Sequence, residues 1–138
     1  MYIAWHIDCV NLFKHNMPTN RITRRRVMMS KYDEPLISGF ERACKKYPNH
    51  TALIYIGEKI SYKKLKESID RFATALHNLG VKQYDKVMLY LPNCPQFLIG
   101  YFAAQKIGAV AVPVSPIYTP HEISYLINDS GAETVLCQ

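Results

Sequence analysis

A short apolar run, Val87–Leu91, constrains the fold of this chain more than any other stretch of its sequence. Such a run fits a β-strand that is covered on both faces, as the strands of parallel sheets are. Pro92 and Pro95 follow it, and a proline suits the first turn of a helix, here one that runs to about Ile107. That helix is apolar almost all round, which is typical of a buried helix. Ala109–Val114 then predicts a second strand of the same kind.

The unit of strand, helix and strand is then repeated. Thr119 and Glu122 match a capping box, in which the threonine hydroxyl and the glutamate carboxylate each accept a backbone N–H of the first turn. The buried face of this helix is predicted from its spacing: Ile123, Leu126 and Ile127. Gly131 is expected to end the helix, and Glu133–Cys137 begins a further strand. This alternation predicts an α/β fold, part of a doubly wound, mainly parallel sheet with flanking helices and right-handed crossovers.

Three elements are predicted before the first of these strands. A helix opens at Pro35 and ends at Lys46. An amino-terminal hairpin follows, with strands at 51–56 and 59–62 around Gly57-Glu58, a glycine-first loop that fits a type II′ turn.

Ser61 can cap the third element, a helix with an apolar stripe that ends at Gly80. Lysines at 63, 64 and 66 fall mostly off that stripe, and we interpret them as a solvated face.

Residues 1–33 differ from the rest and are predicted to be a basic extension outside the fold formed by residues 34–138. Residues 1–31 carry +5 of the net charge of +6, so a nucleic-acid-binding patch would have to lie there, and none is expected. No basic residue precedes the apolar stretch Met1–Phe13, which argues against a secretory signal. Organellar import through residues 1–31 is the alternative to a cytoplasmic protein. We expect the physiological chain to start near Met28 or Met29, which mass spectrometry of the native amino terminus would check.

Motifs for chemistry are absent from the sequence. The six glycines are too scattered for a phosphate-binding loop: Gly39, Gly57, Gly80, Gly100, Gly108 and Gly131. No serine nucleophile elbow is present, and His50, His77 and His121 are isolated. The sequence therefore predicts no catalytic, cofactor-binding or metal-binding residue, and no cofactor for this chain.

The four cysteines lack the close spacing of a zinc site and are interpreted as small hydrophobic residues of a reduced, intracellular protein: Cys9, Cys44, Cys94 and Cys137. No run of eighteen apolar residues is present, so no membrane-spanning helix is predicted.

Several motifs from about Pro35 to Gln138 together indicate a family by their order and spacing. They are Ile60–Leu65, Gly80–Val87, Leu91–Phe97, Gly108–Thr119 and Asp129–Ala132. This arrangement resembles the amino-terminal region of the adenylate-forming (AMP-dependent) synthetases, of the acyl-CoA synthetase or fatty acid–CoA ligase type. Lys64 and Gln96 stand where the family usually has glutamate, and Tyr84 where it usually has glycine.

The resemblance implies the chemistry of a whole enzyme. A carboxylate attacks the α-phosphate of ATP-Mg to give an acyl-adenylate, and the thiol of CoA then displaces AMP. The family's nucleotide-binding loop and catalytic lysine lie downstream of this region, so neither maps onto a residue here, and Lys106 is not assigned that role. Residues 34–138 are thus expected to be the amino-terminal part of the AMP-binding large domain, an incomplete domain.

Two functional interpretations follow. The chain is a truncated amino-terminal portion of a fatty acid–CoA ligase that is inactive alone. Alternatively, it is a non-catalytic interaction module that complements or decoys a full-length synthetase, with a complementary synthetase segment as its partner. An incomplete sheet leaves edges and apolar faces open, so we expect the isolated chain to be poorly soluble without such a segment.

Overall fold

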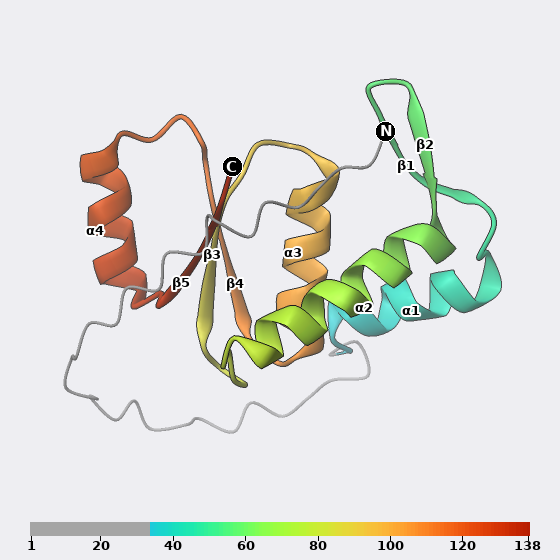
Figure 1. The fold of residues 1–138 in the computed structure, drawn as a ribbon, viewed down its shortest axis with the longest axis horizontal. Coiled ribbons are helices and arrows are strands. Elements are labelled where there is room, and N and C mark those ends of the chain that lie inside the picture. Colours follow the sequence, from blue (N-terminus) through green and yellow to red (C-terminus); the bar gives the residue numbers. More distant parts are fainter. Residues whose placement is uncertain (1–33) are drawn as a thin grey trace.

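The computed structural model describes residues 34–138 (Figure 1). The predictions for residues 1–33, including the start near Met28 or Met29, lie outside the described residues. The described part contains four helices and five strands: α1 (Leu36–Lys46), β1 (Thr51–Tyr55), β2 (Glu58–Ser61), α2 (Tyr62–Asn78), β3 (Lys86–Tyr90), α3 (Pro95–Lys106), β4 (Val110–Val114), α4 (Pro120–Ser130) and β5 (Thr134–Cys137). None of these helices is long and apolar enough to cross a membrane.

The centre of the fold is a three-stranded parallel sheet in the order β4-β3-β5. Successive residues of β3 alternate between the two faces of this sheet, and Val87, Met88 and Leu89 are all fully buried. Val87 and Leu89 belong to a large core with residues of α2 and α3, whereas Met88 packs on the opposite face with residues of α4. Helices therefore cover both faces of the sheet, and the predicted doubly wound, mainly parallel α/β architecture is confirmed (Figure 1).

The two crossover connections leave the sheet in opposite directions. From β3, the chain passes through α3 and returns on one side of β3 as β4; from β4, it passes through α4 and returns on the other side as β5. Because α3 and α4 lie on opposite faces, both crossovers have the same hand, as the rule for parallel connections requires. The turns after β3 and β4 thus diverge to opposite faces of the sheet.

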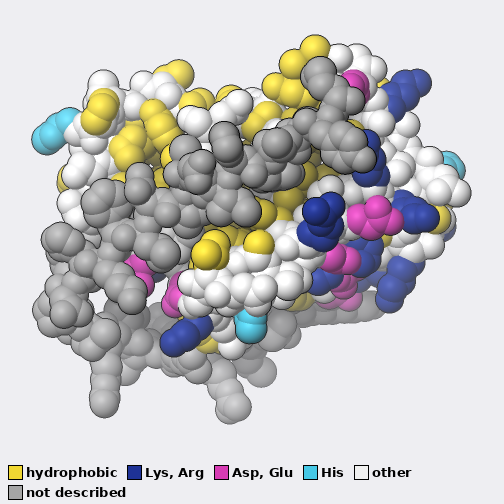
Figure 2. All heavy atoms as spheres, in the orientation of Figure 1, with side chains coloured by type: hydrophobic (Ala, Val, Ile, Leu, Met, Phe, Trp, Pro, Cys, Tyr) yellow, Lys and Arg dark blue, Asp and Glu magenta, His cyan; other side chains and the backbone are white. Residues whose placement is uncertain are grey.

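Helix α2 packs along α3 through an apolar stripe that lies at helical spacing: Leu65, Ile69, Ala73 and Leu76 are buried. The hydroxyl of Ser61 accepts the N–H of Lys64 at 3.2 Å, so the predicted cap is confirmed. Lys63 and Lys64 are exposed. Figure 2 shows Lys and Arg side chains interspersed with Asp and Glu over the side of the molecule where α1 and α2 lie, which fits the predicted solvated face.

The hairpin contains a turn that differs from the prediction. The two loop residues are Ile56 and Gly57, with φ of 47° and 80°, and the strands close on the pair Tyr55 and Glu58. Positive φ at both central residues makes this a type I′ turn, one residue earlier than the predicted type II′ loop. Both type I′ and type II′ turns match the right-handed twist of the strands, so twist does not decide between them. The register that pairs Tyr55 with Glu58 places Ile56 and Gly57 in the loop, and the type I′ turn holds a β-branched residue in the left-handed region.

Helix α4 is capped as predicted but is less buried than predicted. The Glu122 carboxylate accepts the N–H of Thr119 at 2.7 Å, and the Thr119 hydroxyl accepts the N–H of Glu122 at 3.4 Å. Gly131 ends the helix with φ of 65°. The predicted inner face is only half-buried and consists of Ile123, Leu126 and Ile127. No residue of α4 is fully buried. Among the described elements α4 stands alone on its face of the sheet, so no second helix packs against its flanks (Figure 1).

Candidate functional site

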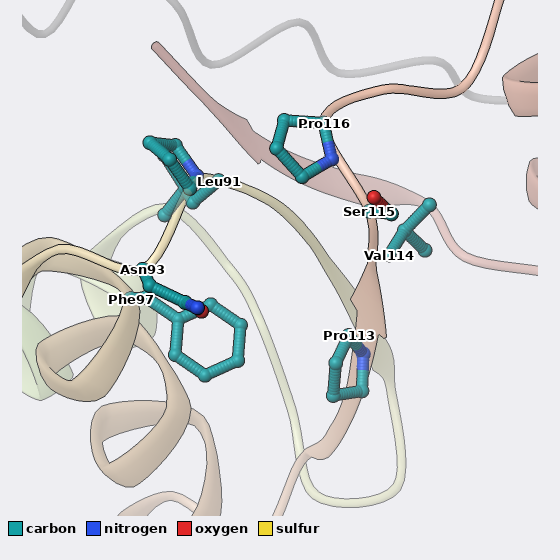
Figure 3. Close-up of a pocket in the computed structure, with 8 residues that line it drawn as sticks. Leu91, Asn93, Phe97, Pro113, Val114, Ser115 and Pro116 are labelled. Carbon is teal, nitrogen blue, oxygen red and sulfur yellow. The ribbon is translucent and has the colours of Figure 1, made fainter.

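The turns that follow β3 and β4 enclose an open pocket of about 380 Å³ (Figure 3). Its walls come from the carboxyl ends of these two strands and from the first turn of α3: Leu91, Pro92, Asn93, Phe97, Pro113, Val114, Ser115 and Pro116. In doubly wound sheets, ligands bind outside the carboxyl ends of the strands, where adjacent connections diverge to opposite faces. The pocket therefore lies at the position where the topology favours a ligand.

The first wall is formed by the entry into α3. Pro92 and Asn93 are exposed, whereas Cys94 is buried and occupies the N-cap position without a side-chain capping hydrogen bond. Pro95 then takes the first helical position, as the sequence predicts. The amide group of Asn93 and the ring of Phe97 both project into the space between α3 and β4 (Figure 3). The pocket therefore combines an apolar surface with one neutral hydrogen-bonding side chain on this wall.

The second wall is held in place by a tyrosine. The hydroxyl of Tyr90, the last residue of β3, lies 3.1 Å from the carbonyl oxygens of both Pro116 and Tyr118. The hydroxyl of Ser115 accepts the N–H of Ile117 at 3.4 Å. These contacts tie the turn after β4 to the central strand, so the shape of the pocket depends on Tyr90.

We expect the Tyr90→Phe variant to lower the free energy of unfolding by about 1 kcal/mol, because it removes the hydrogen bond of the hydroxyl and keeps the ring. The amide of Tyr118, which donates to the carbonyl of Ser115 at 3.3 Å, should also exchange its hydrogen faster. Urea unfolding and amide exchange would measure both effects. The exposed Tyr125 supplies the control, since Tyr125→Phe should change neither quantity. An unchanged exchange rate at Tyr118 in the Tyr90→Phe variant would contradict the assignment.

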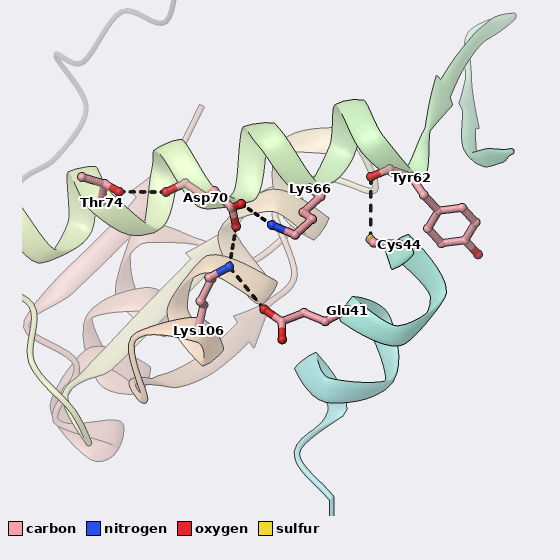
Figure 4. A network of polar contacts seen from close by, with 7 residues as sticks. All are labelled: Glu41, Cys44, Tyr62, Lys66, Asp70, Thr74 and Lys106. Atoms are coloured by element: carbon pink, nitrogen blue, oxygen red, sulfur yellow. Dashed lines mark hydrogen bonds and ion pairs between the residues drawn. The ribbon is translucent and has the colours of Figure 1, made fainter. Parts of the chain in front are cut away.

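A polar network joins the opposite end of α3 to α1 and α2 (Figure 4). The Nζ of Lys106 hydrogen-bonds to the carboxylate of Asp70 and lies 3.3 Å from that of Glu41. Lys66 pairs with the same aspartate one helical turn away. Burial by itself raises the pKa of Asp70, but the hydrogen bonds from Lys106 and Lys66 outweigh it and lower that pKa. The hydrogen bond to Asp70 raises the pKa of Lys106 despite its partial burial.

This network lies at the carboxyl end of α3, while the pocket lies at its amino end. The 12 residues of the helix separate them by about 18 Å at 1.5 Å per residue. Cys44 lies close to the network; burial raises the pKa of its thiol, which donates to the carbonyl of Tyr62 at 3.7 Å. A buried, protonated thiol is unreactive. We therefore assign the network to the packing of three helices.

We expect the Lys106→Met variant to lower the free energy of unfolding by about 1 kcal/mol near neutral pH, a value reduced for the partial exposure of the pair. Asp70 has a lowered folded-state pKa, so its contribution is present above 3.8 and is lost as the pH falls through that folded-state pKa. Lys106 has a raised folded-state pKa, so its contribution is present below 10.5 and is lost as the pH rises through that folded-state pKa.

Urea unfolding across this pH range should show the variant and the wild type converging at both extremes. The exposed Lys63→Met variant is the control and should stay parallel to the wild type throughout. A Lys106→Met effect that is constant from acidic to alkaline pH would show that the ion pairs do not contribute.

Comparison with known proteins decides the family. The family described as AMP-binding enzyme matches residues 40–138, well over half of the chain. This chain belongs to the AMP-binding enzyme family. The resemblance to adenylate-forming synthetases is thereby confirmed.

Two curated relatives are similar to this AMP-binding chain. It is 36% identical over 104 residues to a long-chain-fatty-acid–CoA ligase of Salmonella typhimurium, covering 75% of this chain and 18% of the ligase. It is 35% identical over 108 residues to the long-chain-fatty-acid–CoA ligase of Haemophilus influenzae, covering 78% of this chain and 19% of that ligase. The chain thus spans less than a fifth of the length of these relatives.

Solved structures are also similar to this chain. The Klebsiella oxytoca NpsA N-terminal subdomain, solved in complex with 3-hydroxyanthranilyl-AMSN, is 30% identical with a TM-score of 0.69, and the alignment covers 71% of this chain and 25% of that subdomain. VinN, 23% identical with a TM-score of 0.75, shares the fold and aligns over 78% of this chain and 29% of its own.

The predicted absence of site residues stays a prediction for this AMP-binding chain. His50, His77 and His121 are exposed and lie apart from the pocket lining. Within residues 34–138, no three His, Cys, Asp or Glu side chains gather where a metal ion could bind. The pocket was not predicted, although its lining falls within two of the family motifs, Leu91–Phe97 and Gly108–Thr119. The signal that could have located it is the divergence of two consecutive connections of a parallel sheet.

Proposed function

We propose that this chain forms the amino-terminal part of the large domain of a fatty acid–CoA ligase. The observation that carries the proposal is the 36% identity to a long-chain-fatty-acid–CoA ligase, a relative of which this chain spans 18%. In the whole enzyme, a fatty acid carboxylate attacks the α-phosphate of ATP, pyrophosphate leaves, and the CoA thiol then displaces AMP to form the thioester.

The contribution of this chain to that reaction is structural. Its parallel sheet and the turns after β3 and β4 form one wall of a crevice, and Asn93 and Ser115 are the polar groups that face it. The sequence contains no glycine-rich loop that could bind the phosphates of ATP. The described residues also offer no cluster of carboxylates that fits Mg²⁺, so we derive no step through a metal here.

We infer that the 138-residue chain is inactive alone and acts together with the remaining part of a synthetase. A cytoplasmic location is part of the same proposal: Cys44 and Cys94 are buried thiols without disulfides, as is usual in reducing compartments. Cell fractionation with an antibody to the chain checks the location, and recovery in an organellar fraction would contradict it.

A reconstitution experiment tests the proposed function. The partner polypeptide is the segment of the Salmonella typhimurium ligase that follows the stretch matched by this chain. We expect acyl-CoA formation from a long-chain fatty acid, ATP and CoA when the two are combined, and none with either alone. The ligase's own amino-terminal segment, supplied separately, is the control that shows that the split enzyme can reassemble. If that control is active and this chain gives no thioester, the proposed function is wrong.

A further inference from the structure

The two outer margins of the central sheet, on β4 and on β5, differ in the backbone groups that they present. In β4, the direction of these groups follows from one hydrogen bond. The N–H of Val110 donates to the carbonyl of Asp85 at 2.8 Å, so the backbone groups of Val110 point toward β3. Backbone groups alternate in direction along a strand, so Ala111 and Pro113 point away from β3. Pro113 lies opposite Leu89 and has no N–H, so the outer margin of β4 lacks a hydrogen-bond donor at this position.

Proline on an outward-facing position is a device by which sheets protect an edge, because a further strand would lack a donor there. The rest of β4 has the character of an edge as well. Val110 is 45% exposed, and Pro113 is also exposed. The outer margin of β4 is therefore an edge of the sheet that is protected against pairing with a further strand.

The margin of β5 has the opposite character. Leu89 pairs with Leu136, and Met88 pairs with Val135. Since Leu89 points its backbone toward β4, Met88 points toward β5, and in a parallel pair the partner of an inward-pointing residue points outward. The N–H and carbonyl of Val135 thus lie on the outer margin, where no described strand pairs with them.

The side chains of β5 are those of an interior strand. None of its four residues is exposed. Leu136 lies in the large core on one face, and Val135 packs with the α4 cluster on the other. A strand that is covered on both faces, and whose outer margin no described strand occupies, is placed like a strand in the middle of a parallel sheet. The relatives contain the polypeptide that such a sheet needs, since this chain corresponds to only 25% of the NpsA N-terminal subdomain.

We propose that the sheet grows only from β5, whose outer margin receives a parallel strand from the remaining part of a synthetase large domain, while Pro113 closes the β4 margin. This inference rests on the proposed function for the identity of the partner. The incoming strand would bond to the outward N–H and carbonyl of Val135. Helices of the remaining part of the large domain would then cover both faces of the added strand and extend the two hydrophobic cores.

A matched pair of proline variants tests the proposal on the full 138-residue chain. Ala111→Pro and Val135→Pro each remove one outward-facing N–H, the first on β4 and the second on β5, without removing a bond to β3. The probe is the Salmonella typhimurium ligase segment described above, with affinity measured by titration calorimetry. We expect Ala111→Pro to bind like the wild type and Val135→Pro to bind about tenfold more weakly, because a strand hydrogen bond is lost and proline opposes pairing.

A measurement on the unchanged chain covers the case in which a proline variant fails to fold. On complex formation, hydrogen exchange at the amide of Val135 should slow, while that at the amide of Ala111 should stay fast. Slowing at Ala111 instead, equal weakening by both variants, or no association of the wild type with the segment would overturn the proposal. If the ligase segment adds a strand at β5 but no thioester forms, the strand-addition proposal holds and the proposed function is wrong.

Discussion

Replacing Leu89 by alanine is expected to lower the free energy of unfolding by about 3–5 kcal/mol. Leu89 lies in the central strand, its side chain is fully buried, and it faces the core shared with α2 and α3. The substitution removes apolar contacts and leaves a cavity that two packed helices and a sheet cannot readily close. The loss is comparable to much of the total stability of a small domain.

Urea unfolding followed by circular dichroism measures this effect. The control is Leu36→Ala at the start of α1, because Leu36 is 59% exposed and should change the unfolding free energy by less than about 0.5 kcal/mol. Equal effects at the two leucines would mean that β3 is not the centre of the core.

The Gly100→Val variant should lower the unfolding free energy by about 2–3 kcal/mol through overpacking. A Cβ atom at Gly100 would lie 3.0 Å from Cδ1 of Leu136 and 3.3 Å from Cδ2 of Leu89, side chains that belong to two adjacent strands. At Gly100, helix α3 therefore lies so close to the sheet that an added side chain must displace Leu136 or Leu89. The fixed β-sheet on one side and α2 on the other leave the helix little room to shift.

Gly39→Val supplies the matched control for this variant, because a Cβ there meets only Nη2 of Arg42 at 3.9 Å. Both glycines lie inside helices, so the gain in helix propensity over glycine is the same at the two positions. The difference between the variants therefore isolates packing. Destabilisation by Gly39→Val of the size expected for Gly100→Val would assign the effect to the helix backbone rather than to contact with the sheet.

Local patterns in the sequence were sufficient for the elements and for most of their ends. The apolar run of β3, the capping serine and threonine, and the glycine after α4 are decided by neighbouring residues, and the structure confirms each. The hairpin turn was predicted wrongly because Gly57 fits either the first position of a type II′ loop or the second position of a type I′ loop. The local sequence does not distinguish these two loops. The register of the paired strands, with Tyr55 opposite Glu58, brings Ile56 into the loop.

Features that depend on the assembled fold could not be predicted from local patterns. How deeply Ile123 is buried depends on which elements cover the flanks of α4. The spacing of the apolar residues in α4 does not contain this information. The ion pairs of Lys106 join residues 36 and 65 positions away along the chain. The pocket needs two turns from different strands to meet, which follows only after the order β4-β3-β5 is known.

We propose that this chain supplies a wall of the synthetase crevice and that the groups that bind the phosphates of ATP lie in the remaining part of the enzyme. The exchange of labelled pyrophosphate into ATP, driven by a long-chain fatty acid, tests it most directly. We predict no exchange with the purified 138-residue chain and clear exchange once the complementary ligase segment is added. Exchange by the 138-residue chain alone would contradict the claim.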